Sequence, residues 1–453
     1  MKTLKLYLTT LQLEGYDILR FIKWIIKNYS TKTIEIKKNL VITPKIKLII
    51  LLSIILSILL FSFSFLISNN LIIPLLVIIL IATQSYILFI LSTLILKPFE
   101  YAFKTVSIIK TKYKITANKK LKVIAITGSY GKTSIKEILY QLIKDKYKTL
   151  RTPESYNTIF GISKMIDFEL DETYEIFICE MAAYKKGDIK ELCNMVPPHY
   201  GILTGITTQH LERFGNLNNI IKTKFELYDS IKNKENMVIN LNNQNIISEV
   251  KKRNIIKPIG YIKATNMSFS KNGSEFEFTY KNKRYQVTTK LFGIFNIENI
   301  LGALTMALKL NIDTEYLIKK INKLVPIQSR FVLKTLDNST LVDNTFSSNE
   351  VTFKKTIETA KMVNGKKVLI TPGLVELGEH EEKINFQIGS LAKNVFGKII
   401  LVGNNKRTQS FAKSFKTKPE FINDTREEYF KKINDLKDNY EWIFLENDIT
   451  QNY

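Results

Sequence analysis

Residues 121–133 read LKVIAITGSYGKT, and this stretch decides the fold. Leu121–Ile126 is a short apolar run typical of a buried strand, and a helical pattern follows from Ser134 to Lys144. A glycine loop that ends in GKT joins the two. This order of elements binds phosphate, because backbone N–H groups and the helix N-terminus both face the anion. The stretch therefore predicts a nucleotide site in an α/β domain with a mostly parallel sheet.

The loop supplies most of the predicted nucleotide-binding residues. Lys132 would reach the β- and γ-phosphates of ATP, and the hydroxyl of Thr133 would hold Mg²⁺. The glycines let the backbone approach the phosphates without a Cβ clash. Position 126 is Ile where the longer form of the motif has glycine, so the prediction rests on the strand–loop–helix context. The predicted set is Gly128, Ser129, Gly131, Lys132, Thr133 and Ser134.

Two later strands each end in a candidate metal ligand. Tyr174–Glu180 (YEIFICE) is an apolar run that ends in an acid, and Gly201–Ile206 (GILTGI) leads into a loop with His210. The C-terminal ends of neighbouring parallel strands meet at one edge of the sheet, where Mg²⁺ ligands lie in such folds. The alternatives are a surface Glu that ends a strand and a structural His. We expect Glu180 and His210 at the nucleotide site.

The motifs together resemble the Mur ligases, over about residues 120–453. Within that family the resemblance is nearest to the members that add D-alanyl-D-alanine to a UDP-muramoyl tripeptide. The order of the motifs carries the resemblance more than any one of them. They are TGSYGKT (127–133), TPESYNTIFG (152–161), EMA (180–182), GDIKEL (187–192), HLERFG (210–215), GIFNIEN (293–299), Ser329–Arg330, VDNTFSSN (342–349) and TPGLVELGE (371–379).

The resemblance implies a reaction in which ATP phosphorylates a substrate carboxylate and an amine then attacks the acyl phosphate. It implies Mg²⁺ held by Thr133, Glu180 and His210, with Lys132 on the phosphates. Lys224, in the segment TKFEL, falls where the family carries a carbamylated lysine that helps hold a second Mg²⁺. Without the resemblance Lys224 would be read as a solvated helix lysine. Lys132, Lys224 and His210 are thus the expected catalytic residues, and ATP and Mg²⁺ the expected cofactors.

Four further residues are expected around the nucleotide by the same resemblance. Asn296 and Asn299 match family positions near ATP, and Arg330 and Asp343 match positions that close on ATP from a C-terminal domain. The reaction brings anions together, so cations must gather at the site. The implied partners are a muramoyl-peptide acceptor and an amino acid or dipeptide donor.

The chain also departs from the family pattern. Position 295 is Phe where His is frequent, position 350 is Glu where Pro is usual, and Asn242–Asn243 replace a frequent acidic pair. The tripeptide-adding relatives usually begin with a soluble domain that grips the UDP-sugar, whereas residues 1–120 here carry a long apolar segment. The acceptor can therefore be UDP-linked or lipid-linked. The cysteines, Cys179 and Cys193, cannot build the four-cysteine zinc motif of a further relative.

The apolar segment runs from Leu48 to Leu96 without a charged residue, which predicts transmembrane spans at 48–67 and 71–96. A buried core hairpin is the alternative. Lysines on both sides predict that both ends are cytoplasmic, in a multi-pass protein of the cell membrane with cytoplasmic catalytic domains. Residues 1–47 would form an N-terminal segment with an interfacial or docking helix at 11–27. The lipid bilayer is therefore an expected partner.

The composition fits a folded protein of two or three domains: 453 residues, 45% hydrophobic and 24% charged. The formal net charge of +24 comes mostly from lysine. No basic segment carries a nucleic-acid motif, so we expect attraction to anionic lipid and no nucleic-acid partner.

The expected architecture has a P-loop central domain at 121–326 after a connector at 97–120. A smaller Rossmann-like α/β domain follows at 327–453, with strands at 340–345, 367–371, 398–402 and 442–446. Residues 236–290 contain short polar strands that predict a small β subdomain. Three other functions stay open: a sibling ligase such as a polyglutamate-adding enzyme, a nucleotide-binding scaffold without catalysis, and a GTPase switch. The chain has no NKxD motif for guanine, which disfavours the switch.

Overall fold

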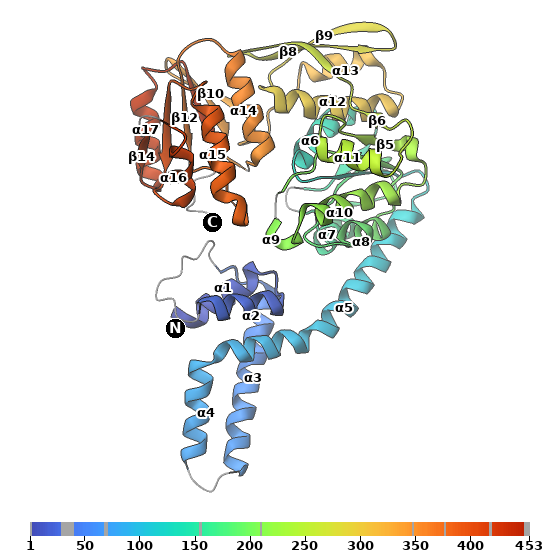
Figure 1. Cartoon of the computed structure of the whole chain (residues 1–453). Helices are drawn as coiled ribbons and strands as arrows, with labels where there is room; N and C mark the ends of the chain where they lie inside the picture. The colour runs from blue at the N-terminus through green and yellow to red at the C-terminus, as the bar shows by residue number, and fades with distance from the viewer. Residues whose placement is uncertain are drawn as a thin grey trace. The chain divides into compact units, whose positions relative to one another are not determined.

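The computed structural model describes residues 2–28, 40–67, 71–153, 156–208, 211–346, 348–375, 377–415 and 419–447 (Figure 1). The chain forms two compact units, one up to Val106 and one from Ser107 onward. The first unit is helical, and the second contains the sheets.

The first unit is built from α1 (Lys2–Leu13), α2 (Ile18–Asn28), α3 (Pro44–Ile67), α4 (Ile72–Thr83) and the first part of α5 (Ser85–Ala117). A small core joins α1, α2, the start of α3 and the start of α5, and its buried members include Leu11, Phe21, Ile49 and Phe89. The hydroxyls of Ser53 and Ser92 meet at 2.9 Å and link α3 to α5.

Two helices of this unit are long and apolar enough to cross a membrane, α3 and α5. The apolar side chains of α3 beyond Ser53 are mostly exposed, with Leu66 at 84%. The sequence predicted one span over 71–96, but the helix breaks at Gln84, which caps α4. The physical reason lies in packing, because α5 turns there to bury Phe89 and Ser92 against the rest of the unit.

The prediction of a single helix over 11–27 was also wrong. The chain turns between α1 and α2, where Gly15 and Tyr16 both adopt the left-handed conformation with φ of 66° and 61°. Glycine reaches that region at no steric cost, and it commonly ends a helix.

The central sheet of the second unit is parallel, with the order β2-β3-β1-β4-β5-β6. Alternate residues of β1 face opposite layers: Val123 and Ala125 join the core under α7, α8 and α10, while Ile124 and Ile126 join the core under α6 and α12. The strands are β1 (Lys122–Thr127), β2 (Thr149–Arg151), β3 (Ile176–Glu180), β4 (Tyr200–Leu203), β5 (Met237–Ile239) and β6 (Ile259–Gly260). The helices are α6 (Lys132–Ile143), α7 (Ile159–Glu169), α8 (Asp188–Met195), α9 (Leu211–Phe214), α10 (Leu217–Ser230), η1 (Lys234–Asn236), α11 (Gln244–Lys252), α12 (Ile294–Lys309) and α13 (Thr314–Ile321).

The C-terminal sheet has the order β10-β11-β15-β12-β13-β14, and only its β10–β11 pair is antiparallel among the described strands. Its strands are β10 (Val332–Leu336), β11 (Ser339–Asn344), β12 (Lys367–Thr371), β13 (Lys398–Val402), β14 (Glu420–Ile422) and β15 (Trp442–Glu446). Helices cover it on both faces: α14 (Glu350–Met362), η2 (Gly378–His380), α15 (Glu381–Ala392), α16 (Lys406–Ala412) and α17 (Arg426–Leu436).

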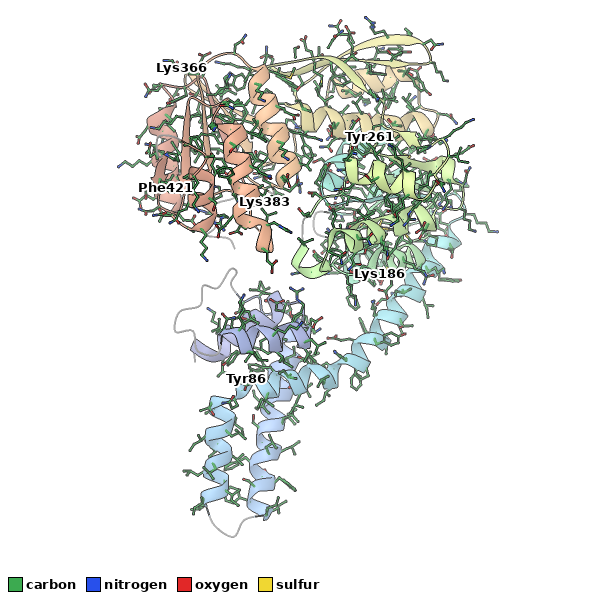
Figure 2. The ribbon with its side chains drawn as sticks, in the orientation of Figure 1. Tyr86, Lys186, Tyr261, Lys366, Lys383 and Phe421 are labelled. Carbon is green, nitrogen blue, oxygen red and sulfur yellow. The ribbon has the colours of Figure 1, made fainter. Side chains whose placement is uncertain are left out.

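A separate antiparallel sheet contains β7 (Ala264–Ser270), β8 (Gly273–Tyr280) and β9 (Lys283–Thr289), as the polar strands of 236–290 predicted. Lysines such as Lys186, Lys366 and Lys383 project from the surface of the second unit (Figure 2). The large positive charge is therefore spread over the outside of the fold.

Candidate active site

The glycine loop joins β1 to α6 at the C-terminal edge of the central sheet. The loop packs closely on its neighbours, since a Cβ on Gly128 would lie 2.0 Å from the hydroxyl oxygen of Thr204. Gly131 starts the helix with φ of 79°, which glycine adopts without strain. Lys132 folds back over the loop and donates to the carbonyl oxygens of Gly128 (2.9 Å) and Ser129 (3.3 Å). The loop thus presents a cation and a helix N-terminus to one point.

Glu180, at the end of β3, lies against the start of α6. The hydroxyl of Thr133 donates to Glu180 Oε2 at 3.0 Å, and Asn157 Nδ2 donates to Oε1 at 3.3 Å. The ammonium of Lys136, which is fully buried, lies 3.3 Å from Oε2. Burial alone would raise the pKa of Glu180, but Lys132, Lys136 and these two hydrogen bonds together hold the pKa below its ordinary value. Glu180 is therefore an anion aimed at the loop.

Lys224 lies in α10 and is buried beside the same cleft. Burial lowers the pKa of its amine to about 7, the nearby Lys132 lowers it further, and Asp188 and Glu226 oppose the shift. Glu226 holds the start of α8 in place by accepting from the backbone N–H groups of Gly187 (2.8 Å) and Lys190 (2.9 Å). A lysine with this pKa is substantially neutral near pH 7, which makes its nitrogen nucleophilic.

One cleft brings most of these groups together. Of the residues predicted from the sequence, it is lined by Gly128, Ser129, Gly131, Lys132, Thr133, Glu180, Lys224 and Arg330. Arg330 comes from the segment before β10, and its guanidinium stacks 4.0 Å from the centre of the Phe346 ring. The positive charge of Arg330 helps to lower the pKa of Lys132, after burial, which is the larger cause. The cleft thus brings Lys132 and Lys224 of the central domain and Arg330 of the C-terminal domain together around the loop.

Four predicted residues do not line the cleft. The Asn296 side chain makes a hydrogen bond at the start of α12, where its Nδ2 donates to the carbonyl oxygen of Phe292 at 3.0 Å. Asp343 pairs with Lys334 at 2.6 Å and accepts from the Thr345 hydroxyl, although the next residue, Asn344, does line the cleft. The remaining two, Ser134 and Asn299, are buried, and Ser134 Oγ and Asn299 Nδ2 have no hydrogen-bond partner among the residues that the structure describes.

Asn299 nevertheless lies against the loop, because a Cβ on Gly131 would be 2.9 Å from its Oδ1. A buried amide donor without a partner costs free energy. His210 lies outside the described residues, and its predicted role stays a prediction.

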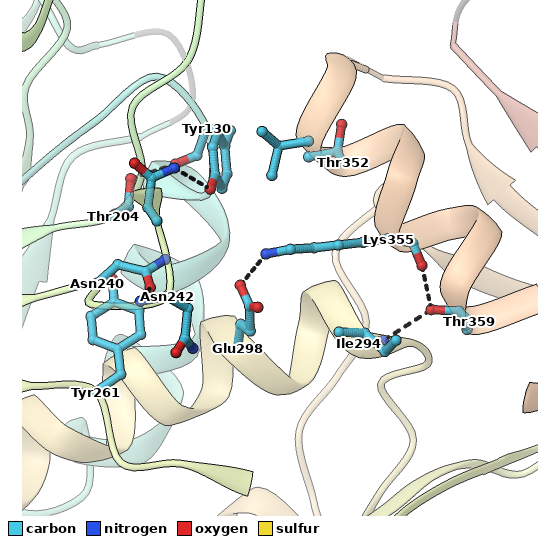
Figure 3. A network of polar contacts seen from close by, with 12 residues as sticks. Tyr130, Thr204, Asn240, Asn242, Tyr261, Ile294, Glu298, Thr352, Lys355 and Thr359 are labelled. Carbon is cyan, nitrogen blue, oxygen red and sulfur yellow. Dashed lines mark hydrogen bonds and ion pairs between the residues drawn. The ribbon is translucent and has the colours of Figure 1, made fainter. Parts of the chain in front are cut away.

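Sequence reasoning missed several residues that shape the site. Tyr130, in the loop itself, accepts a hydrogen bond from Asn243 Nδ2 at 3.1 Å, and this pairing explains the amide at a position where the family often has an acid. Across from Tyr130, Lys355 of α14 forms an ion pair with Glu298 of α12, and the hydroxyl of Thr359 accepts from the Ile294 N–H at 3.1 Å (Figure 3). These contacts join the C-terminal domain to the central domain. A loop aromatic and a distant Lys–Glu pair give no local sequence signal.

A buried acid lies beneath the cleft in the C-terminal sheet. Glu446, at the end of β15, accepts from Asn344 Nδ2 through both carboxylate oxygens, Oε1 (3.0 Å) and Oε2 (2.9 Å), and from the hydroxyls of Ser348 and Thr356. Burial raises the pKa of Glu446 to about 7 against these hydrogen bonds, which act to lower it. Glu446 thereby fixes Asn344, which reaches the cleft.

Comparison with known proteins identifies the central part of the chain. Residues 126–307 match the family model described as Mur ligase middle domain. This stretch is similar to the Mur ligase middle domain. The family resemblance seen in the sequence is confirmed by this match and by relatives named UDP-N-acetylmuramoyl-tripeptide–D-alanyl-D-alanine ligase. The one from Buchnera aphidicola is 26% identical over 69% of this chain and 71% of its own length. That from Escherichia coli K12 is 24% identical over 64% of this chain and 66% of its own length.

Solved structures share the fold of both α/β domains. A crystal structure of MurF from Acinetobacter baumannii has a TM-score of 0.68, with 22% identity over 77% of this chain and 78% of that one. MurF ligase from Thermotoga maritima in complex with ADP has a TM-score of 0.65, with 23% identity over 77% of this chain and 80% of that one. The predicted α/β fold class is thereby confirmed, while the membrane hairpin before it stays a prediction.

The donor set of this cleft fits Mg²⁺ bound together with a nucleotide. Thr133 and Glu180 offer oxygen atoms to one point beside the phosphate-binding loop, and Mg²⁺ prefers oxygen ligands. Among the described residues there is no cluster of three or more His, Cys, Asp or Glu side chains that could hold a metal alone. Mg²⁺ commonly keeps water molecules and phosphate oxygens and takes only one or two carboxylates from the protein.

Proposed function

We propose that this chain is an ATP-dependent ligase of peptidoglycan precursor synthesis. It would join the carboxylate of a muramoyl peptide to an amine, with D-alanyl-D-alanine as the favoured donor. The observation that carries the proposal is one cleft in which Lys132, the Thr133–Glu180 pair and Lys224 meet. The names of the similar ligases support the same reaction.

The chemistry assigns a task to each group. Lys132 and the helix N-terminus neutralise the phosphates while the γ-phosphoryl group moves to a carboxylate oxygen and ADP leaves. The donor nitrogen then attacks the acyl carbon, the C–N bond forms, phosphate departs, and the nitrogen loses a proton. Thr133 and Glu180 would hold a Mg²⁺ ion, which would shield the charge of the phosphates.

Lys224 contributes through its nitrogen. A neutral lysine amine adds to CO₂ and loses a proton, which gives a carbamate with two oxygen atoms. A carbamate at this position would replace a cation with an anionic group whose oxygen atoms could hold a second Mg²⁺ ion. The lowered pKa of Lys224 supports this step, because only the neutral amine reacts.

The C-terminal domain completes the site. Arg330 faces the loop from that domain, and Asn299 offers its free amide donor from α12. Acyl phosphates hydrolyse in water, so a cleft closed by a second domain protects the intermediate.

We further propose that the helical unit anchors the enzyme in the cell membrane as a multi-pass protein, with the catalytic domains in the cytoplasm. The apolar side chains exposed on α3 and α4 support this proposal, because such surfaces are stable in lipid and unfavourable in water. The same faces favour a second candidate function, in which the acceptor is a lipid-linked muramoyl peptide rather than the UDP-linked form.

The deciding experiment measures phosphate release and product mass with ATP, Mg²⁺ and the purified full-length protein in detergent. UDP-muramoyl tripeptide and its lipid-linked form are compared, each with and without D-alanyl-D-alanine. We expect release only when acceptor and dipeptide are both present, with a new amide in the product. The Lys132→Ala variant should show no release. Nucleotide binding without turnover on a wide panel of acceptors and amines would instead identify a scaffold.

A further inference from the structure

The first part of α5, from Ser85 to Val106, has two different faces. One face is packed against the helical unit, where Phe89, Ser92 and Thr93 are buried. In Figure 1 this part of α5 runs across the α3–α4 pair rather than along it. Its position therefore differs from that of a third helix in a hairpin bundle.

The other face carries an exposed apolar stripe. Its members recur every three or four residues, which places them on one side of the helix. Exposure increases along the stripe, from 42% at Ile87 to 69% at Phe99 and 63% at Val106. The stripe consists of Ile87, Leu91, Leu94, Ile95, Phe99, Ala102 and Val106.

The charged residues of the same segment lie on the opposite side of the helix. At about 100° per residue, Lys97, Glu100 and Lys104 all fall away from the stripe. Glu100 is held there by Lys45 of α3, at 2.6 Å. The segment thus has an apolar side and an opposite side that carries two lysines and one acid, with the exposed Tyr101 (75%) and Phe103 (70%) between the two sides.

We propose that this stripe lies along the plane of the membrane, at the boundary between lipid headgroups and acyl chains. The proposal rests on the membrane anchoring proposed above and adds where α5 lies. Two observations select lipid as the occupant. Exposed apolar side chains cover α3 and α4 of the same unit, and Lys97 and Lys104 lie on the side of α5 away from the stripe, where they would meet water and anionic headgroups.

The length of α4 agrees with an in-plane α5. Its 12 residues cover about 18 Å at 1.5 Å per residue, whereas the hydrocarbon core is about 30 Å thick. An α5 helix that lies flat at the base of the α3–α4 pair adds about one helix diameter, roughly 10 Å, to the depth that the unit fills. In this arrangement the first part of α5 lies in the plane of the membrane surface, at one end of the α3–α4 pair.

Spin labels test this placement in the full-length protein. Cysteines replace Phe99 and Val106 on the stripe, with Lys97→Cys and Lys104→Cys as matched controls on the opposite side. The native Cys179 and Cys193 are buried, so the nitroxide reagent labels the new site. The protein is reconstituted in vesicles of phosphatidylcholine and phosphatidylglycerol. Collision rates are measured with oxygen, which concentrates in lipid, and with a water-soluble nickel chelate.

We expect the nickel collision rate at 99 and 106 to be several-fold below that at 97 and 104, with oxygen rates in the reverse order. If α5 crossed the bilayer, residues on both sides would be shielded from nickel alike. If a second copy covered the stripe, both collision rates would fall at 99 and 106, and labels on neighbouring copies would broaden each other's spectra. Equal, high nickel rates at every site would also overturn the proposal.

Flotation separates this proposal from the one on which it rests. A protein that does not float with the vesicles at all is not anchored, and the membrane location fails. A protein that floats while Phe99→Cys and Val106→Cys labels meet water leaves the anchor intact and removes only the role of α5. Ligation in detergent is independent of both outcomes.

Discussion

The two units of the chain use the same apolar residue types in opposite ways. In the second unit Ile, Leu, Val and Phe fill four buried clusters, and lysines such as Lys186 and Lys366 are exposed at the surface. In the first unit, helices of the same residue types leave Ile58, Leu66 and Leu75 more than half exposed. Burial of apolar side chains away from water explains the first pattern. The second pattern is the one expected of the membrane anchor that we propose, because side chains that face lipid need not be buried in protein.

The largest effect is expected where the catalytic unit concentrates its chemistry. Lys224→Ala should lower the ligation rate by about 10²- to 10³-fold, because it removes a group that supports charge at the reacting centre. Nucleotide affinity and vesicle flotation should change little. The measurement is ligation rate beside ADP affinity by calorimetry.

Lys222→Ala is the matched control, since Lys222 is an exposed lysine in the same helix. Its rate should equal that of the unaltered protein. Full ligation by Lys224→Ala would remove the assigned role and leave Lys224 as a structural lysine.

A pair of leucine truncations tests the contrast in solvent directly. Leu304 is fully buried in α12, and Leu304→Ala should cost about 2–5 kcal/mol of unfolding free energy through lost contacts and a cavity. Leu59 is 59% exposed in α3, and Leu59→Ala should cost at most about 0.5 kcal/mol. Denaturant titration in detergent, followed by near-UV circular dichroism, gives both values. A large loss for Leu59→Ala would mean that α3 is packed against protein, as in the core-hairpin alternative.

The sequence predicted the second unit well because its strands have clear local signals. β12, β13 and β15 occupy the predicted residues 367–371, 398–402 and 442–446, since a buried parallel strand is an apolar run bounded by polar residues. The glycine loop between β1 and α6 was predicted equally well. In the first unit the break at Gln84 has no such signal, because tertiary packing, and not a helix-breaking residue, redirects the chain.

The sequence predicted which segments form the site, but it did not predict the position of every side chain. Asp343 is next to the cleft, yet its carboxylate is taken by Lys334 and Thr345 within its own domain. The pairing of Tyr130 with Asn243 joins residues 113 positions apart, so no motif reports it. Backbone motifs predict where a site lies, whereas competing partners decide which side chains reach it.

The last prediction concerns pH and the buried Glu446 of the C-terminal sheet. Its pKa of about 7 in the folded state lies above the ordinary value of 4.5, so folding favours the protonated form. The associated stability is full below pH 4.5 and is lost as the pH rises to about 7, by on the order of 3 kcal/mol at most. Glu446→Gln should flatten this part of the stability profile, while Glu382→Gln, at an exposed position, should leave it unchanged. The slope between pH 4.5 and 7 is the quantity to compare, because the amide also loses one acceptor for the hydroxyls of Ser348 and Thr356 and so shifts the whole curve. An unchanged slope in Glu446→Gln would mean that Glu446 stays ionised in the fold and holds Asn344 as a carboxylate.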